Sequence, residues 1–100
     1  MWHKGAKMKK LRTHDQEKNI IASRLIKLRN LCGYSQRELA EQLQLKDFNV
    51  DKNLITRIET NSRYVSDFEI KTFSEFFGVS YSYLLDGIPT KEDIKKYPDL

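Results

Sequence analysis

Apolar residues recur from Asn19 onward at the three- and four-residue spacing that is typical of amphipathic helices. The first apolar stripe is formed by Ile21, Leu25, Leu28 and Cys32. Gly33 follows this stripe directly, and a glycine in this place commonly ends a helix in a left-handed conformation. Because no segment alternates between apolar and polar residues over a useful length, the pattern predicts an all-helical chain without a sheet.

Capping residues divide the chain after Gly33 into four further helices. The predicted N-caps are Ser35, Asp51, Ser66 and Ser80. A glutamate stands three residues after Ser35 and after Ser66, which is the spacing of a capping box. The corresponding helices are predicted to end near Leu43, Thr60, Phe77 and Leu85. Five helices with short connections predict a compact bundle, in which the second and third helices have the arrangement of a helix-turn-helix.

One domain accounts for most of the 100 residues, and the pattern places it at residues 19–87. Residues 88–100 are interpreted as a tail or a short extra helix, because Thr90 and Asp93 have the spacing of a helix start. The chain has no apolar run of the length needed to span a membrane and no signal peptide. We therefore expect a cytoplasmic protein without a membrane partner.

Composition excludes several classes of site. Cys32 is the one cysteine, so the chain can form neither an internal disulfide nor a cysteine-based zinc site. His3 and His14 have no metal-ligand spacing around them, and no glycine-rich phosphate loop or catalytic motif is present. We expect no metal, no cofactor and no enzymatic activity.

The net charge of +4 is concentrated at the N-terminus. Residues 1–18 hold six basic and two acidic residues, which leaves twelve of each sign in the remaining 82. This tail has few apolar residues, so it is predicted to be disordered alone and suited to a polyanion. The alternative is a leader that only aids solubility.

Several short motifs follow one another at characteristic intervals. They are Leu28-Arg29, the run from Gly33 to Ala40, the run from Ile55 to Glu59, and Phe77-Gly78-Val79-Ser80 with Leu84-Leu85. In this order they resemble the phage-repressor/Cro family of helix-turn-helix domains, over about residues 19–87. The resemblance implies an all-α, lambda-repressor-like bundle of five helices that binds double-stranded DNA through helices 2 and 3.

The turn between those two helices departs from the family pattern. The interval from Leu43 to Ile55 is about five residues longer than usual, and the insertion falls in residues 44–49. Phe48 or Leu45 is expected to hold this lengthened loop against the bundle. Lys46 lies within it and is a candidate for a contact with the DNA backbone.

Polar residues at two helix ends are candidates for phosphate contacts. Ser35 and Gln36 stand at the start of helix 2, where free N–H groups and the helix dipole favour a phosphate. Asn61 and Arg63 lie in the polar turn after helix 3. The resemblance also implies that Glu59 pairs with Arg29, tying helix 1 to the end of helix 3; the alternative is two unrelated surface charges.

The base-reading candidates follow from the helical period of helix 3. If Ile55 and Ile58 face the core, the opposite face carries Lys52, Asn53, Thr56 and Arg57. Asparagine can pair with adenine, arginine or lysine with guanine, and a threonine methyl can meet the methyl of thymine. The resemblance places base contacts at the same positions, whereas the alternative is an ordinary solvated face.

Two functions fit these features. The first is a sequence-specific transcriptional regulator, a repressor that occupies a palindromic operator as a homodimer, with Tyr81 and Tyr83 at the contact between subunits. The second is an antitoxin that binds a toxin protein and autoregulates its operon. An exposed apolar C-terminus would favour the antitoxin, but residues 91–100 contain only Ile94, Tyr97 and Leu100 as apolar residues, which favours the repressor.

Overall fold

Six helices make up the part of the chain that the computed structural model describes, residues 17–100. They are α1 (Ala22–Leu31), α2 (Gln36–Leu45), α3 (Lys52–Glu59), α4 (Asp67–Phe77), α5 (Tyr81–Asp86) and α6 (Lys91–Lys96). The all-helical prediction is therefore confirmed, and the segment after Gly87 contains a sixth helix. Residues 1–16, which include most of the basic tail and both histidines, lie outside the described residues.

The helices begin where the capping signals predicted. Ser35 and Ser66 each accept a hydrogen bond from the backbone N–H three residues later, and the glutamate at that position bonds back to the serine N–H. Asp51 and Ser80 cap α3 and α5 in the same way through a side-chain oxygen. Gly33 has a φ of 76°, the left-handed conformation expected after α1.

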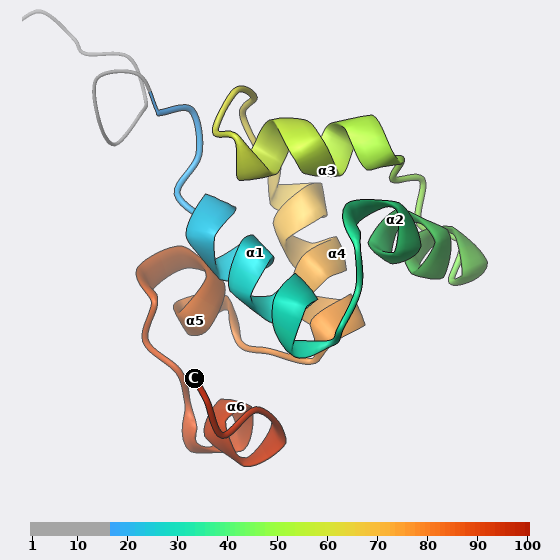
Figure 1. Ribbon diagram of the computed structural model, residues 1–100. Coiled ribbons are helices and arrows are strands. Elements are labelled where there is room, and N and C mark those ends of the chain that lie inside the picture. The colour runs from blue at the N-terminus through green and yellow to red at the C-terminus, as the bar shows by residue number, and fades with distance from the viewer. Residues whose placement is uncertain (1–16) are drawn as a thin grey trace, which may run out of the picture.

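The core is formed by the inward faces of α1 to α5. Its largest fully buried side chains are Phe73, Phe77, Ile21, Leu25, Leu28, Leu39, Leu43, Ile55, Ile58 and Leu84. Helices α1 and α2 both pack against α3, and α4 packs against α5. As Figure 1 shows, this arrangement places α3 along one end of the domain and α6 at the opposite end.

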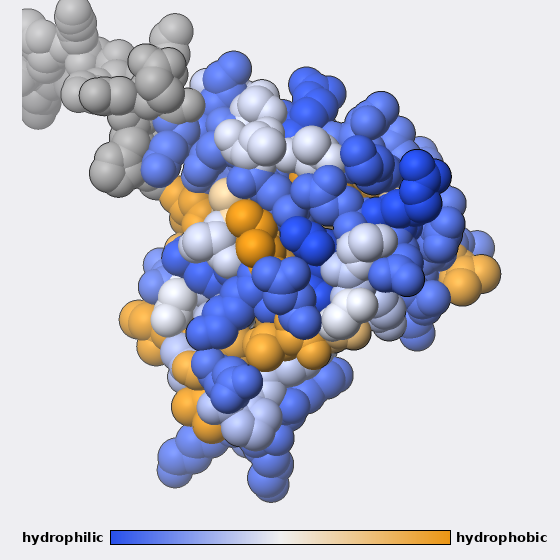
Figure 2. Space-filling model, in the orientation of Figure 1, coloured by the Kyte–Doolittle hydropathy of each residue, from blue (hydrophilic) through white to orange (hydrophobic). Residues whose placement is uncertain are grey.

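The surface differs between these ends. Figure 2 shows mainly hydrophilic residues over the end formed by α3, while hydrophobic residues gather farther from it, on the side where Figure 1 places α5. Within residues 17–100, none of the helices has the length and apolar character needed to cross a membrane.

An asparagine before α1 joins segments that are distant in sequence. The side chain of Asn19 is buried; its oxygen accepts hydrogen bonds from the N–H groups of Ile21 and Ala22 and thereby satisfies the start of α1. Its amide nitrogen donates to the carbonyl of Ile58 in the last turn of α3 and to the carbonyl of Arg63 in the turn that follows α3. The helical pattern was predicted to begin at Asn19, but α1 begins at Ala22, and Asn19 precedes it and hydrogen-bonds both to its start and to the segment around the end of α3.

Candidate nucleic-acid interface

The lengthened turn between α2 and α3 is folded down onto the domain. Phe48 packs against the core and Val50 is buried, while the side-chain amide of Gln44 donates to the Val50 carbonyl over 3.1 Å. Of the two residues expected to hold the loop, Phe48 does so, whereas Leu45 is 75% exposed. Lys46 lies at the C-terminal end of α2 and is exposed.

The predicted base-reading residues lie on one face of α3. Ile55 and Ile58 are fully buried, and Leu54 is partly buried against the same core. On the other side of the helix, Lys52, Asn53 and Arg57 are exposed and Thr56 is half-buried. This face can present two cationic groups, an amide and a hydroxyl to a groove of DNA.

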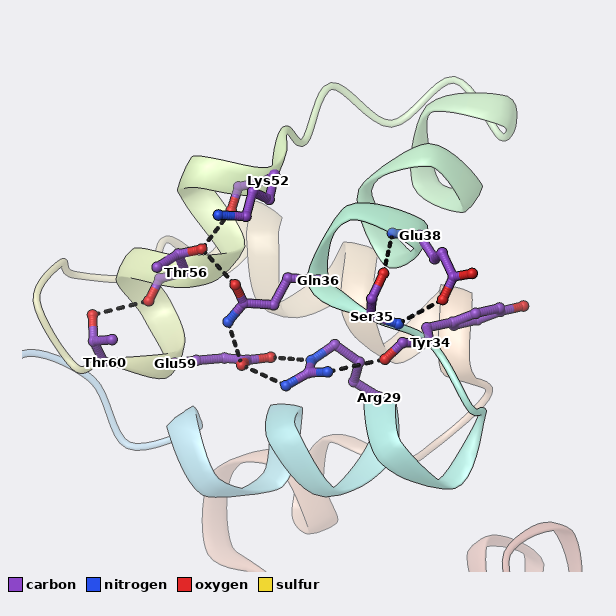
Figure 3. A network of polar contacts seen from close by, with 9 residues as sticks. All are labelled: Arg29, Tyr34, Ser35, Gln36, Glu38, Lys52, Thr56, Glu59 and Thr60. Atoms are coloured by element: carbon purple, nitrogen blue, oxygen red, sulfur yellow. Dashed lines mark hydrogen bonds and ion pairs between the residues drawn. The ribbon is translucent and has the colours of Figure 1, made fainter.

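A polar network behind this face joins three helices (Figure 3). Arg29 from α1 makes a two-pronged ion pair with Glu59 at the end of α3, with its Nε 2.7 Å from Oε2 and its Nη2 2.9 Å from Oε1. A third arginine nitrogen donates to the carbonyl of Tyr34 in the turn before α2. The hydrogen bond to Glu59 raises the pKa of Arg29, against the opposite effect of burial. The side chain of Glu59 is only 4% exposed, so the pair is largely shielded from water.

Gln36, a predicted phosphate-binding residue, belongs to the same network. Its side-chain nitrogen donates to Oε1 of Glu59 over 2.8 Å, and its side-chain oxygen accepts from the hydroxyl of Thr56 over 2.7 Å. Figure 3 shows the glutamine side chain extending from α2 to both residues of α3. Its oxygen is therefore engaged within the protein, and only the second hydrogen of its amide nitrogen is left to donate to a phosphate.

Other predicted phosphate-binding residues also have structural partners. The hydroxyl of Ser35 accepts from the N–H of Glu38, so its role at the start of α2 is that of a cap. The side-chain oxygen of Asn61 accepts from the N–H groups of Lys18 and Asn19, at a backbone φ of 62°.

Arg63 is paired as well, since its Nη1 lies 2.8 Å from a carboxylate oxygen of Glu69. Ser35, Asn61 and Arg63 can therefore contact DNA only through hydrogen-bond donors that their bonds within the protein leave free. Arg37 was not singled out by sequence reasoning, yet it is exposed in the first turn of α2 beside Gln36. Its position at a helix start, next to a phosphate candidate, is the signal that could have identified it.

The two tyrosines predicted to lie at the dimer contact differ in their exposure to solvent. Tyr81 is 49% exposed, but Tyr83 is only 5% exposed and packs inside the domain, so only Tyr81 can lie at a contact between subunits. Burial raises the pKa of Tyr83, and nearby Arg24 partly opposes this. Tyr81 borders an open groove of about 540 Å³ between α4 and α5, whose apolar lining includes Phe68, Ile70 and Leu85.

A family model described as a helix-turn-helix matches residues 25–84, which is more than half of the chain and spans all of α2 to α4. No curated protein and no solved structure matches the chain.

Proposed function

Since the chain belongs to the Cro/C1-type helix-turn-helix family of DNA-binding regulators, we propose that it is a repressor that reads a palindromic operator in the major groove. Sequence would be read by α3, and the start of α2 would hold the adjoining phosphates. Two copies of the chain would bind the two halves of the operator.

The observation that carries this proposal is the outer face of α3. Its two isoleucines are fully buried, so the helix cannot rotate, and Lys52, Asn53 and Arg57 are thereby held exposed. Asparagine offers the donor and acceptor that match adenine, and arginine matches the two acceptors of guanine. The network of Arg29 and Glu59 fixes α3 against α1, which gives these side chains a rigid base.

Phosphate contacts would set the position of α3 in the groove. The first N–H groups of a helix have no intrahelical partner, and the amide nitrogen of Gln36, the first residue of α2, keeps one hydrogen that it can donate. Arg37 adds a positive charge in the same turn, and Lys46 adds one at the other end of the helix. Such contacts contribute affinity without sequence information.

A homodimer follows from the size of the reading surface. A single domain of this kind covers about 600–1,000 Å² of DNA-facing surface and reads few base pairs. The exposed Tyr81 and the apolar groove beside it offer a surface that a second copy would cover. Half-sites would then lie about 34 Å apart on one side of the duplex.

The antitoxin alternative has less support from the C-terminal segment. Tyr97 and Leu100 both pack against the core, so Ile94 is the one of the three apolar residues in this segment that is exposed. A toxin-binding segment would need more apolar surface than this offers.

Selection of bound duplexes from a random pool would test the proposal, followed by affinity measurements on the selected site and on random DNA at one salt concentration. We expect Asn53→Ala and Arg57→Ala to weaken binding to the selected site by about 1–3 kcal/mol and to leave random DNA nearly unaffected. Lys46→Ala is the matched control, because its exposed side chain has no part in the network; it should weaken both kinds of binding alike. A pool that yields no common sequence would contradict the proposal, and a single asymmetric half-site would contradict the dimer.

A further inference from the structure

We propose that Thr56 reads a base by accepting a hydrogen bond, and that the network behind α3 forces this polarity on its hydroxyl. The base would be one that offers an exocyclic amino group in the major groove, which is adenine through N6 or cytosine through N4. The inference rests on the proposed function, because it concerns the same face of α3. A threonine hydroxyl is ordinarily able to donate or accept, so its polarity must come from its surroundings.

The polarity starts at Glu59. Its carboxylate is nearly buried, and both of its oxygens accept hydrogen bonds from nitrogens of Arg29. Any side chain that faces Oε1 must therefore present a donor. Gln36 does so with its amide nitrogen, 2.8 Å away.

This contact determines which way the glutamine amide points. With the reverse orientation, the carbonyl oxygen of Gln36 would face the carboxylate of Glu59, which places two acceptors together with no hydrogen between them. The nitrogen therefore stays on the side of Glu59, and the oxygen faces Thr56 at 2.7 Å. Because an amide oxygen only accepts, the hydroxyl of Thr56 must donate to it.

The hydroxyl of Thr56 has a second acceptor on the protein side. The backbone carbonyl of Lys52, one turn earlier in α3, lies 3.0 Å from Oγ1. The single hydroxyl hydrogen thus faces two protein acceptors, of which the Gln36 oxygen is the nearer. Whatever DNA brings to this oxygen must itself be a donor.

DNA offers few donors to such an oxygen. Phosphate oxygens only accept, so Thr56 is not suited to the backbone. In the major groove, guanine presents acceptors and thymine presents an acceptor and a methyl group, while adenine and cytosine each present an amino group. The position of Thr56, one turn after Lys52 and beside Arg57, places it among the base-reading candidates.

The test begins with the operator selected by the wild-type protein. At each position of the half-site, affinity is measured for all four bases with the wild type, Thr56→Val, which keeps the shape but lacks the hydroxyl, and Thr56→Ser, which keeps the hydroxyl. We expect one position where the wild type prefers adenine or cytosine by about five- to tenfold, the size of one neutral hydrogen bond. The valine variant should lose this preference, and the serine variant should retain it.

Base analogues then identify the group that is read. Replacing the preferred adenine by purine, or the preferred cytosine by 2-pyrimidinone, removes only the amino group. This change should weaken wild-type binding by the same five- to tenfold factor and leave Thr56→Val unaffected. Gln36→Leu removes the nearer of the two acceptors and leaves the Lys52 carbonyl, so we expect the preference for the amino group at this position to weaken and not to disappear.

The outcomes separate the two proposals. A wild type that selects no sequence would overturn the proposed function and this inference together. A selected operator with the same base preferences for wild type and Thr56→Val would overturn the inference alone. So would a preference that disappears in the serine variant but persists in the valine variant, because the methyl group would then be the reader. Thermal melts of each variant check that the fold is retained.

Discussion

Two nearly buried carboxylates lie at opposite ends of this domain and are held in different ways. Glu59, at the α3 end, is paired with the guanidinium of Arg29 and also accepts from Gln36. Asp93, at the α6 end, is 2% exposed and is held by neutral donors, namely the N–H and hydroxyl of Ser80 and the N–H of Thr90. One carboxylate thus has a cationic partner, and the other relies on hydrogen bonds from capping groups.

The two carboxylates differ in how far their contacts extend. The contacts of Glu59 run through Gln36 to Thr56 on the outer face of α3, so the network that stabilises the fold also orients a candidate base reader. The contacts of Asp93 stay local: they cap α6 and join it to the start of α5. We therefore expect changes at Glu59 to affect both stability and DNA recognition, and changes at Asp93 to affect stability alone.

Glu59→Ala should give the largest effect. It leaves the guanidinium of Arg29, whose side chain is 15% exposed, without its ionic partner, and losing one member of such a pair costs about 3–5 kcal/mol when it is buried. Urea-induced unfolding measures the change. Glu69→Ala is the matched control, since its ion pair with Arg63 is more exposed and has one hydrogen bond. Together with the loss of the capping bond from the N–H of Ser66, it should cost about 1 kcal/mol. Equal effects of the two substitutions would contradict the contrast drawn between the pairs.

Asp93→Ala should give an intermediate effect confined to stability. It removes the bond from the N–H of Thr90 to the Asp93 carboxylate, which is one half of the capping box of α6, and the bonds from Ser80. Together these are expected to contribute about 1–2 kcal/mol. The same unfolding measurement applies, accompanied by the affinity for the selected operator. Because α6 lies at the end of the domain away from α3, that affinity should stay within twofold of wild type under folding conditions. A larger drop in affinity would break the assignment of recognition to the α3 end.

Acid should remove the contribution of Asp93 in a defined pH range. Burial alone would raise the pKa of this carboxyl, but hydrogen bonds from Ser80 and Thr90 outweigh burial and hold the pKa below its ordinary value. A lowered pKa in the folded state means that the stabilisation is complete above about pH 4, the unfolded value, and is lost as pH falls through the folded pKa. The difference in unfolding free energy between wild type and Asp93→Asn should therefore be constant from pH 7 to about pH 4 and shrink below it. A difference that grows on acidification would have the wrong sign for this interpretation.

Deletion of residues 1–16 should give the smallest effect, and it extends the comparison to the N-terminus. Lys18 and Asn19 lie beside the end of α3, where their N–H groups donate to the side-chain oxygen of Asn61. If the basic tail binds DNA from there, its removal should weaken binding to all sequences alike. The slope of log affinity against log salt should flatten by about 0.9 for each phosphate that the tail no longer neutralises. An unchanged slope would mean that the tail contacts no phosphate, and that DNA binding depends on the residues at the α3 end alone.

Much of the fold could be predicted because its signals are local. A capping box needs residues three positions apart, and the starts of α2 and α4 at Ser35 and Ser66 were predicted on that spacing alone. The same holds for the outer face of α3: once Ile55 and Ile58 are inside, helical geometry places Lys52 and Arg57 elsewhere on the helix. Each of these features depends only on residues within about one helical turn of each other.

Several functional details could not be predicted because they depend on distant segments. Asn19 and Asn61 are 42 residues apart in sequence, and nothing in either neighbourhood indicates that they meet. Tyr81 and Tyr83 have the same aromatic character and lie in the same short helix, yet only the packing of α5 on the core decides that Tyr83 is the buried one. Gln36 was predicted to bind phosphate through its side-chain amide, and the sequence did not indicate that the amide oxygen accepts from Thr56 within the protein.

Helical periodicity and capping, which act within a few residues, were enough to predict the helices of this domain, the face of α3 that points outward and the chemical groups on that face. The direction in which the hydroxyl of Thr56 hydrogen-bonds follows only from the folded arrangement of α1, α2 and α3. The hydroxyl of Thr56 is committed as a donor to the protein because α1 brings Arg29 to Glu59 and α2 brings Gln36 between Glu59 and Thr56. A hydrogen bond has a direction as well as a length, and that direction is set by partners that meet only when the chain is folded.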